Sequence, residues 1–226
     1  MSSFEPHFAV LPPSQRAIWP ELSSSVQLGL VLYGGTAIAL RLGHRTSIDF
    51  DFFSERPLDF KRLDRAFPFL QRSSVIQSQP DTLSVLVSAL ESEVKVSFFG
   101  SIEIGRVGVP TRTPDGVLEV ASLLDLLATK IKVILQRIEA KDYQDIAAIL
   151  RVGERLDNGL AAARELYGPA FQPNEAIKAL TYFEGGDLAS LSAIDRELLT
   201  RSASSIRKIP MLGRSSHSLS SYRSKL

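Results

Sequence analysis

The chain contains no cysteine, which excludes disulfide bonds, thiol nucleophiles and cysteine-ligated metal sites. Its three histidines, His7, His44 and His217, are too far apart in sequence to form a zinc site of any common short spacing. The absence of cysteine is also typical of proteins that work in a reducing compartment.

Long hydrophobic runs are absent as well. The longest apolar stretch, residues 28–42, is interrupted by three glycines and Arg41 and is shorter than the ~20 residues that a membrane helix needs. The first seven residues, Met-Ser-Ser-Phe-Glu-Pro-His, lack the basic and apolar regions of a signal peptide. We therefore expect a cytoplasmic protein that does not associate with membranes.

The chain also lacks an excess of either charge. Its 26 basic and 25 acidic side chains give a formal net charge of +1, so bulk electrostatics favour neither nucleic acid nor an anionic surface. With 226 residues, of which 44% are hydrophobic, the chain can form one large or two modest globular domains.

The most informative segment is residues 32–40, Leu-Tyr-Gly-Gly-Thr-Ala-Ile-Ala-Leu. It predicts a strand over 28–33, a tight turn, and a helix over 37–42. Such a turn presents unpaired backbone N–H groups and the positive end of a helix dipole to an anion. We expect Gly34, Gly35 and Thr36 to cradle a phosphate.

A second informative segment follows at residues 47–53, which alternate as a strand does. Ile48, Phe50 and Phe52 are predicted on one face, and Asp49 and Asp51 on the other. Two carboxylates placed in this way can hold one or two divalent cations, Mg²⁺ or Mn²⁺, beside a triphosphate.

Arg45 and Ser47 lie between the two segments. Both can contact phosphate groups, although an arginine beside two aspartates is as often part of a structural ion pair. Glycine pairs and Asp-x-Asp sequences are common when each occurs alone. Their succession in a strand–turn–helix–strand order is what favours a nucleotide site.

The remaining pattern predicts an α+β fold. A helix over 58–70 and strands over 73–79, 82–87 and 93–99 complete a small mixed sheet within a domain of residues 1–115. A Pro- and Gly-rich stretch, residues 110–116, leads into a helical domain of residues 116–226. Its helices are predicted at 141–151, 159–167, 174–183 and 188–201, and its basic, serine-rich end, about 202–226, is expected to be mobile.

The first helix of the second domain is predicted from an apolar stripe at spacings of three and four, formed by Leu124, Leu127, Ile131, Ile134 or Leu135, and Ile138. Lys130 and Arg137 are two turns apart on this helix, where both can face an anion. Asp142 and Asp145 are one turn apart on the next helix. Alternatively, the two basic residues are solvated, and Asp142 complements a helix dipole.

Three motifs together resemble a known family: the Gly-Gly-Thr-Ala turn, the block Leu-Gly-His-Arg-x-Ser-x-Asp-x-Asp-Phe-Phe, and the pattern Lys-x6-Arg-x4-Asp-x2-Asp. They are similar to the AbiEii/AbiGii nucleotidyltransferase-like toxins of type IV toxin–antitoxin systems. The resemblance covers residues 29–183. It implies the DNA polymerase β-like nucleotidyltransferase fold, in which a small mixed sheet with flanking helices precedes a helical domain.

The resemblance also implies an activity. A Mg²⁺-dependent nucleotidyltransferase moves a nucleoside monophosphate from a nucleoside triphosphate (NTP) to an acceptor, here an RNA such as the end of a tRNA, and a cognate antitoxin protein accompanies it. By this resemblance Asp49 and Asp51 bind metal, Lys130 neutralises phosphate charge, and Arg137 contacts nucleotide. Asp142 or Asp145 positions a ligand or the attacking hydroxyl.

One departure from the family pattern concerns a third carboxylate, which enzymes of this superfamily usually carry on a neighbouring strand. The candidate strand, residues 94–99, has Ser97 or Lys95 where an acid is expected. Asp142 or Asp145 can substitute, the substrate can supply the missing ligand, or the protein is a catalytically weak nucleotide-binding module. Nucleotidyl or phosphoryl transfer to a protein or a small molecule is a further alternative.

Overall fold

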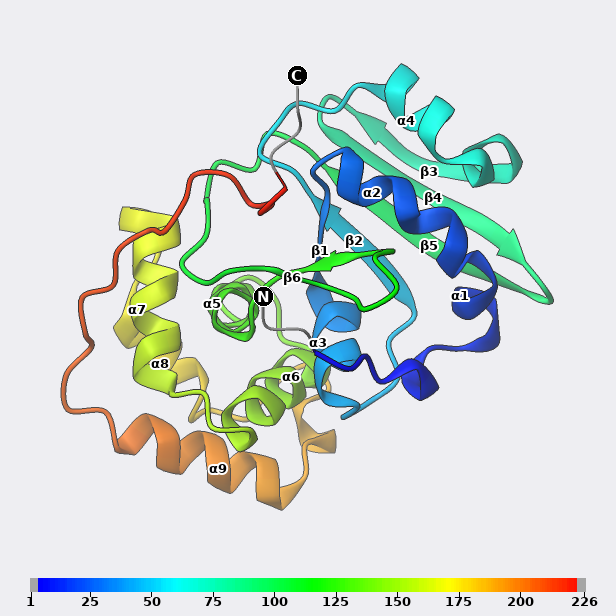
Figure 1. Ribbon diagram of the computed structural model, residues 1–226. Helices are drawn as coiled ribbons and strands as arrows, with labels where there is room; N and C mark the ends of the chain where they lie inside the picture. Colours follow the sequence, from blue (N-terminus) through cyan, green and yellow to red (C-terminus); the bar gives the residue numbers. More distant parts are fainter. Residues whose placement is uncertain (1–3, 223–226) are drawn as a thin grey trace. The chain divides into compact units, whose positions relative to one another are not determined.

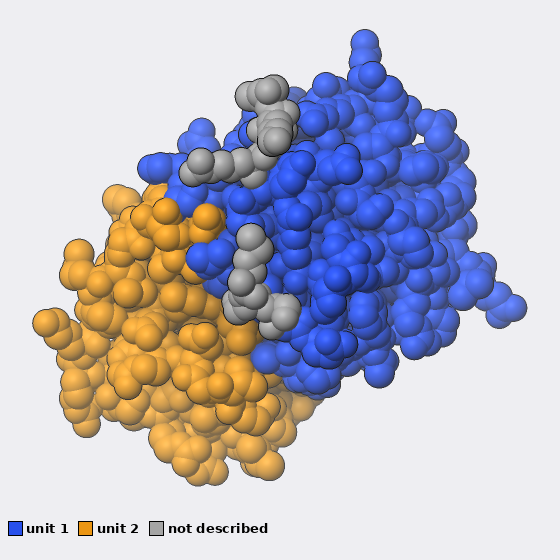
Figure 2. Space-filling view, viewed as in Figure 1, with its two compact units in different colours: residues 1–105, 109–122, 216–226 blue, residues 106–108, 123–215 orange. Residues whose placement is uncertain are grey.

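The computed structural model describes residues 4–222, which divide into two compact units. Among the described residues, the first unit comprises residues 4–105, 109–122 and 216–222, and the second comprises residues 106–108 and 123–215. Figure 2 colours the two units separately. The boundary expected near residue 115 thus falls inside the first unit, and the principal change occurs at residues 122–123.

A seven-stranded mixed sheet forms the centre of the first unit within the described residues, with the strand order β3-β4-β5-β2-β1-β7-β6. The strands are β1 (Val31–Tyr33), β2 (Asp49–Phe53), β3 (Ser73–Gln79), β4 (Thr82–Ala89), β5 (Ser92–Phe99), β6 (Thr111–Arg112) and β7 (Glu119–Val120). The pairs β2·β5 and β1·β7 are parallel, and the other neighbours are antiparallel. The mixed sheet predicted from the sequence is confirmed.

One face of this sheet is a hydrophobic core. Phe50 and Phe52 of β2 are fully buried, as their alternation predicts, and Phe50 lies 6.4 Å from the ring of Trp19. Phe98 of β5 packs against Phe67, with ring centroids 5.1 Å apart. The prediction for Ile48 is wrong: this residue precedes β2 and its side chain is 65% exposed.

The helices of the first unit are short (Figure 1). They are α1 (Pro13–Ile18), α2 (Ser24–Gln27), α3 (Gly34–Leu42) and α4 (Phe60–Ala66), with 3₁₀ turns at Phe8–Val10, Trp19–Ser23 and Pro68–Arg72. The helix expected over residues 58–70 is shorter because the Asp59 side chain caps its start and Pro68 follows its end.

The described part of the second unit is helical. Its elements are α5 (Leu123–Val133), α6 (Ala140–Arg151), α7 (Leu156–Tyr167), α8 (Pro173–Ala179) and α9 (Ala193–Ser204), with 3₁₀ turns at Gly168–Ala170 and Leu188–Ser190. A Cβ on Gly159 would lie 2.5 Å from Leu127, so α5 and α7 pack closely. None of the helices described within residues 4–222 combines the length and apolarity needed to cross a bilayer.

The predicted extent of the first helix of this unit is wrong. The apolar stripe continues to Ile138, but α5 ends at Val133 and Ile138 is 50% exposed. Arg137 therefore lies on the connection between α5 and α6 and not on the helix.

Residues 216–222, which we expected to be part of a mobile tail, are bound to the first unit. Leu219 is fully buried, and its backbone N–H donates to Glu55 at 3.1 Å. The backbone N–H of Ser221 and the hydroxyls of Ser220 and Ser221 donate to the buried carboxylate of Glu119. Residues 202–204 of the predicted tail form the end of α9, and its last residues, 223–226, lie outside the described residues.

Replacement of Leu219 with alanine tests whether this segment belongs to the core. We expect Leu219→Ala to lower the free energy of unfolding by about 2–5 kcal/mol, the usual effect of truncating a buried leucine. Leu90→Ala, at a position that is 73% exposed, is the matched control and should change it by less than about 0.5 kcal/mol. Urea denaturation followed by Trp19 fluorescence measures both; equal effects would show that residue 219 contributes no core packing.

Candidate active site

Asp49 and Asp51 lie on the partly exposed face of β2, opposite the phenylalanine core. Strand β1 pairs with β2 so that Tyr33 is the partner of Asp51. Because α3 begins at the next residue, Gly34, this pairing places the first turn of the helix beside the Asp51 carboxylate.

The approach between Gly34 and Asp51 is close. Gly34 has a φ of +74°, and a Cβ on this residue would lie 2.5 Å from Oδ2 of Asp51. A Cβ on Gly35 would lie 2.5 Å from Nη2 of Arg45 and 3.0 Å from Oγ of Ser47. The structure therefore brings these five sequence-predicted residues together around one turn.

Thr36 connects the first turn of α3 to the start of β2. Its side chain is buried, its hydroxyl donates to the backbone carbonyl of Asp49, and its Oγ1 lies 2.9 Å from Oγ of Ser47. The hydroxyl of Thr36 thus positions Asp49. The side chain of the N-cap residue, Tyr33, makes no cap hydrogen bond. The start of a helix carries a positive electrostatic potential, which favours an anion there.

The carboxylates of this face fit a divalent cation that also binds substrate. Asp49 makes no side-chain hydrogen bond or ion pair with any residue in the described range 4–222. That range contains no group of three or more His, Cys, Asp or Glu side chains arranged to hold a metal. Mg²⁺ commonly binds through one or two carboxylates and completes its coordination with substrate phosphates and water, so Asp49 and Asp51 suffice for this mode.

Strand β5 places no carboxylate directly beside Asp49 or Asp51. Strand β5 places Lys95 beside Asp49 and Ser97 beside Asp51, so the departure expected from the sequence is confirmed. Ser97 is fully buried and accepts a hydrogen bond of 3.0 Å from the hydroxyl of Ser84 on β4. Sequence reasoning missed Ser84, although the short turn at residues 90–91 fixes the β4–β5 register that pairs it with Ser97.

In the second unit, Lys130 and Arg137 converge on two buried aspartates. The ammonium of Lys130 lies 2.6 Å from Asp142 and 2.7 Å from Asp145, and both carboxylates are fully buried. Arg137 donates to both oxygens of Asp142, at 2.8 and 3.1 Å. The four predicted residues are thus in contact. Lys130 and Arg137 do not lie two turns apart on one helix, however, because Arg137 follows the end of α5.

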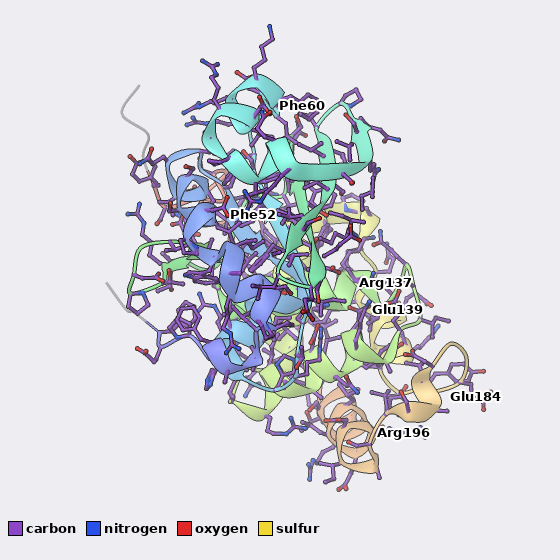
Figure 3. All side chains as sticks on the ribbon, turned by 90° about the vertical axis from the view of Figure 1, so that its right-hand side faces the viewer. Phe52, Phe60, Arg137, Glu139, Glu184 and Arg196 are labelled. Carbon is purple, nitrogen blue, oxygen red and sulfur yellow. The ribbon has the colours of Figure 1, made fainter. Side chains whose placement is uncertain are left out.

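Sequence reasoning also missed Glu139 as a neighbour of this cluster. Its carboxylate lies 3.6 Å from Nε of Arg137, and both side chains are labelled in Figure 3. It also lies 2.7 Å from the ammonium of Lys141. Its position three residues before Asp142 could have indicated a shared arginine partner.

The cluster is electrically balanced. Burial acts to raise the pKa of Asp142, but the hydrogen bond from Arg137 and the charge of Lys130 outweigh burial, and the pKa lies below its ordinary value. Asp142 is therefore ionised at neutral pH opposite two cations. Two of the three N–H donors of Lys130 face these carboxylates, which orients the ammonium.

A double-mutant cycle tests the contact between Gly34 and Asp51. Gly29, at φ +71° and with open space within 4 Å of an added Cβ, is the matched control, because alanine there meets left-handed strain alone, about 1–3 kcal/mol. We expect Gly34→Ala to lower the free energy of unfolding by at least about 1 kcal/mol more than Gly29→Ala. In an Asp51→Ala background this excess should disappear; an excess that persists would contradict the contact.

A second stability measurement tests the buried ion cluster. Lys130→Met leaves two buried carboxylates with one partly exposed arginine, so we expect a loss of about 3–5 kcal/mol in the free energy of unfolding. Lys141→Met removes a surface ion pair with Glu139 and should change it by less than about 1 kcal/mol. Similar small effects in both variants, measured by urea denaturation, would refute the assignment of a buried charge network.

Comparisons with known proteins identify a family that this chain matches. Residues 23–202 match the sequence model of the family described as nucleotidyl transferase AbiEii toxin, type IV TA system. A protein of Aquifex aeolicus (strain VF5), named "Uncharacterized protein aq_aa25", is 33% identical to this chain over 136 residues. The matched region is 58% of this chain and 64% of that relative, so the chain spans just under two thirds of the relative's length.

Proposed function

This chain belongs to the AbiEii nucleotidyl transferase toxin family, and from that premise we propose that it transfers a nucleoside monophosphate from an NTP to an acceptor and releases pyrophosphate. The observation that carries the proposal is the close approach of the Asp51 carboxylate to the backbone of Gly34 at the start of α3. A carboxylate beside a helix N-terminus suits a ligand that contains both a cation and phosphates.

In the first unit, Asp49 and Asp51 would hold Mg²⁺ or Mn²⁺ together with the phosphates of the NTP. The metal would supply charge neutralisation at the phosphates. The backbone of Gly34, Gly35 and Thr36 would bind phosphate oxygens, and the side chains of Ser47 and Arg45 would add donors.

In the second unit, we assign Lys130 and Arg137 to binding substrate phosphate, where they would stabilise the charge that develops during transfer. Asp142 and Asp145 would act chiefly by orienting these two cations, since their oxygens already accept from them. The alternative role of either aspartate, positioning the attacking hydroxyl, requires the cluster to open.

We further propose that the acceptor is an RNA, in particular the end of a tRNA, and that a cognate antitoxin opposes the activity. The family description supports a toxin within a type IV system, and a tRNA end offers the hydroxyl that nucleotidyl transfer requires. Since NTPs and tRNA are cytoplasmic, the reaction would take place in the cytoplasm.

A second candidate function is a catalytically weak nucleotide-binding module. It is favoured by Ser97, which stands beside Asp51 where a third carboxylate would assist deprotonation and metal binding. Ser97 cannot take that role as it stands, because it is fully buried and already paired with Ser84. This candidate predicts nucleotide binding without release of pyrophosphate.

Incubation of the purified chain with total RNA, Mg²⁺ and each of the four α-³²P-labelled NTPs tests the proposal. We expect label in a discrete RNA band, and a loss of about 100-fold or more for Asp49→Asn and for Asp51→Asn. Asp157→Asn, which removes a partly buried carboxylate paired with the exposed Arg155 of the second unit, is the matched control and should retain full labelling.

Three outcomes contradict parts of the proposal. Labelling that survives both aspartate substitutions would refute the metal assignment. Nucleotide binding without labelling or pyrophosphate release would favour the weak module. Mass analysis that finds an added phosphate would establish phosphoryl transfer. A nucleotide found on a protein or a small molecule would establish nucleotidyl transfer to that acceptor.

A further inference from the structure

Lys95 lies directly beside Asp49 on the sheet. The parallel strands β2 and β5 pair Asp49 with Lys95 and Asp51 with Ser97, so all four side chains belong to the same face. Asp49 and Lys95 are both partly exposed to solvent. The face that carries the candidate metal ligands therefore also carries an ammonium group.

These two opposite charges form no ion pair with each other. Directly neighbouring cross-strand charges usually pair, with a gain of about 0.2–1 kcal/mol. Neither Asp49 nor Lys95, however, has a side-chain hydrogen bond or ion pair with any residue from 4 to 222. A neighbouring carboxylate and ammonium that remain separate can each accept a ligand of the opposite charge.

None of the strand neighbours of Lys95 forms an ion pair with it. Its partner on β4 is Leu86, and Ser97 follows it on the same face of β5. Glu93, the preceding residue on that face, is exposed and makes no ion pair with it. On the sheet, the neighbours of Lys95 are therefore an apolar residue, a serine, an exposed glutamate and the candidate metal ligand Asp49.

We propose that Lys95 is a polyphosphate-binding residue, whose ammonium contacts phosphate oxygens of the NTP while Asp49 and Asp51 hold the cation bound to the same phosphates. This inference rests on the proposed function of that face. Lys95 would then have a function at a strand where an acid is usually found. Its ammonium would neutralise part of the phosphate charge that the metal cation does not neutralise.

Removing the charge of Lys95 should affect metal binding and phosphate binding in opposite ways. An ammonium beside Asp49 repels a divalent cation and attracts a polyphosphate, so its removal must change the two affinities in opposite directions. Loss of local structure would instead weaken both. The two readouts together thus separate a binding role from a structural one.

The experiment uses the full chain and two probes. Electron paramagnetic resonance of free Mn²⁺ gives the metal affinity, and calorimetric titration with inorganic tripolyphosphate in excess Mg²⁺ gives the phosphate affinity. We expect Lys95→Gln to tighten Mn²⁺ binding by about 3-fold or more and to weaken tripolyphosphate binding about tenfold. Lys95→Arg should keep both values within about threefold, because it keeps the charge.

Lys61→Gln is the matched control, since it removes an exposed, unpaired lysine of the same unit, and it should change neither affinity by more than about twofold. If the unaltered chain binds both probes but Lys95→Gln shifts neither, or weakens both, the inference about Lys95 is overturned while the proposed function stands. If the unaltered chain binds neither probe, the metal assignment and the inference both fail.

Discussion

The approach of the Asp51 carboxylate to the backbone of Gly34 is the contact on which the candidate site of the first unit depends. It requires β1 to end where β2 passes it, which the pairing of Tyr33 with Asp51 provides. It also requires a residue without a side chain and with a positive φ, which only glycine meets at low cost. The consequence is a helix start, with its positive potential, beside a carboxylate, and one metal–phosphate ligand can interact favourably with both.

The parts of the site that could be predicted from the sequence are those fixed by local periodicity. The alternation along β2 separates Phe50 and Phe52 from the two aspartates, and the glycine pair marks the turn. The short β4–β5 turn likewise makes the place of Ser97 predictable.

The end of α5 was not predictable, because apolar spacing continues past Val133 while Arg137 is held by Asp142 from the following helix. The position of residues 216–222 was not predictable either, because it depends on a contact with Glu119, which lies about a hundred residues away in sequence.

The charge network of the second unit shows why sequence spacing alone is a weak guide to a site. Burying Asp142 and Asp145 costs desolvation energy, and Lys130 and Arg137 offset it only because each hydrogen bond is short and well directed. A single substitution leaves an uncompensated charge, so loss of function in a variant at these positions has to be separated from loss of folding. The same network suits Lys130 to binding substrate, since an ammonium held by two carboxylates has a defined direction before any substrate binds.

The charges of the sheet face set what that face can bind. Two carboxylates and one ammonium on neighbouring positions sum to a formal charge of −1, whereas a third acid in place of Ser97 would make the sum −2. The less negative face would bind a divalent cation more weakly by itself and a metal-bound polyphosphate more readily, because fewer negative groups oppose the phosphates. Substrate would then contribute most of the metal's coordination, which makes cation and nucleotide binding mutually dependent. The lack of an acid beside Asp51 on β5, and the presence of Lys95 without an ion pair to any residue from 4 to 222, would then belong to one arrangement in which the ligand completes the site.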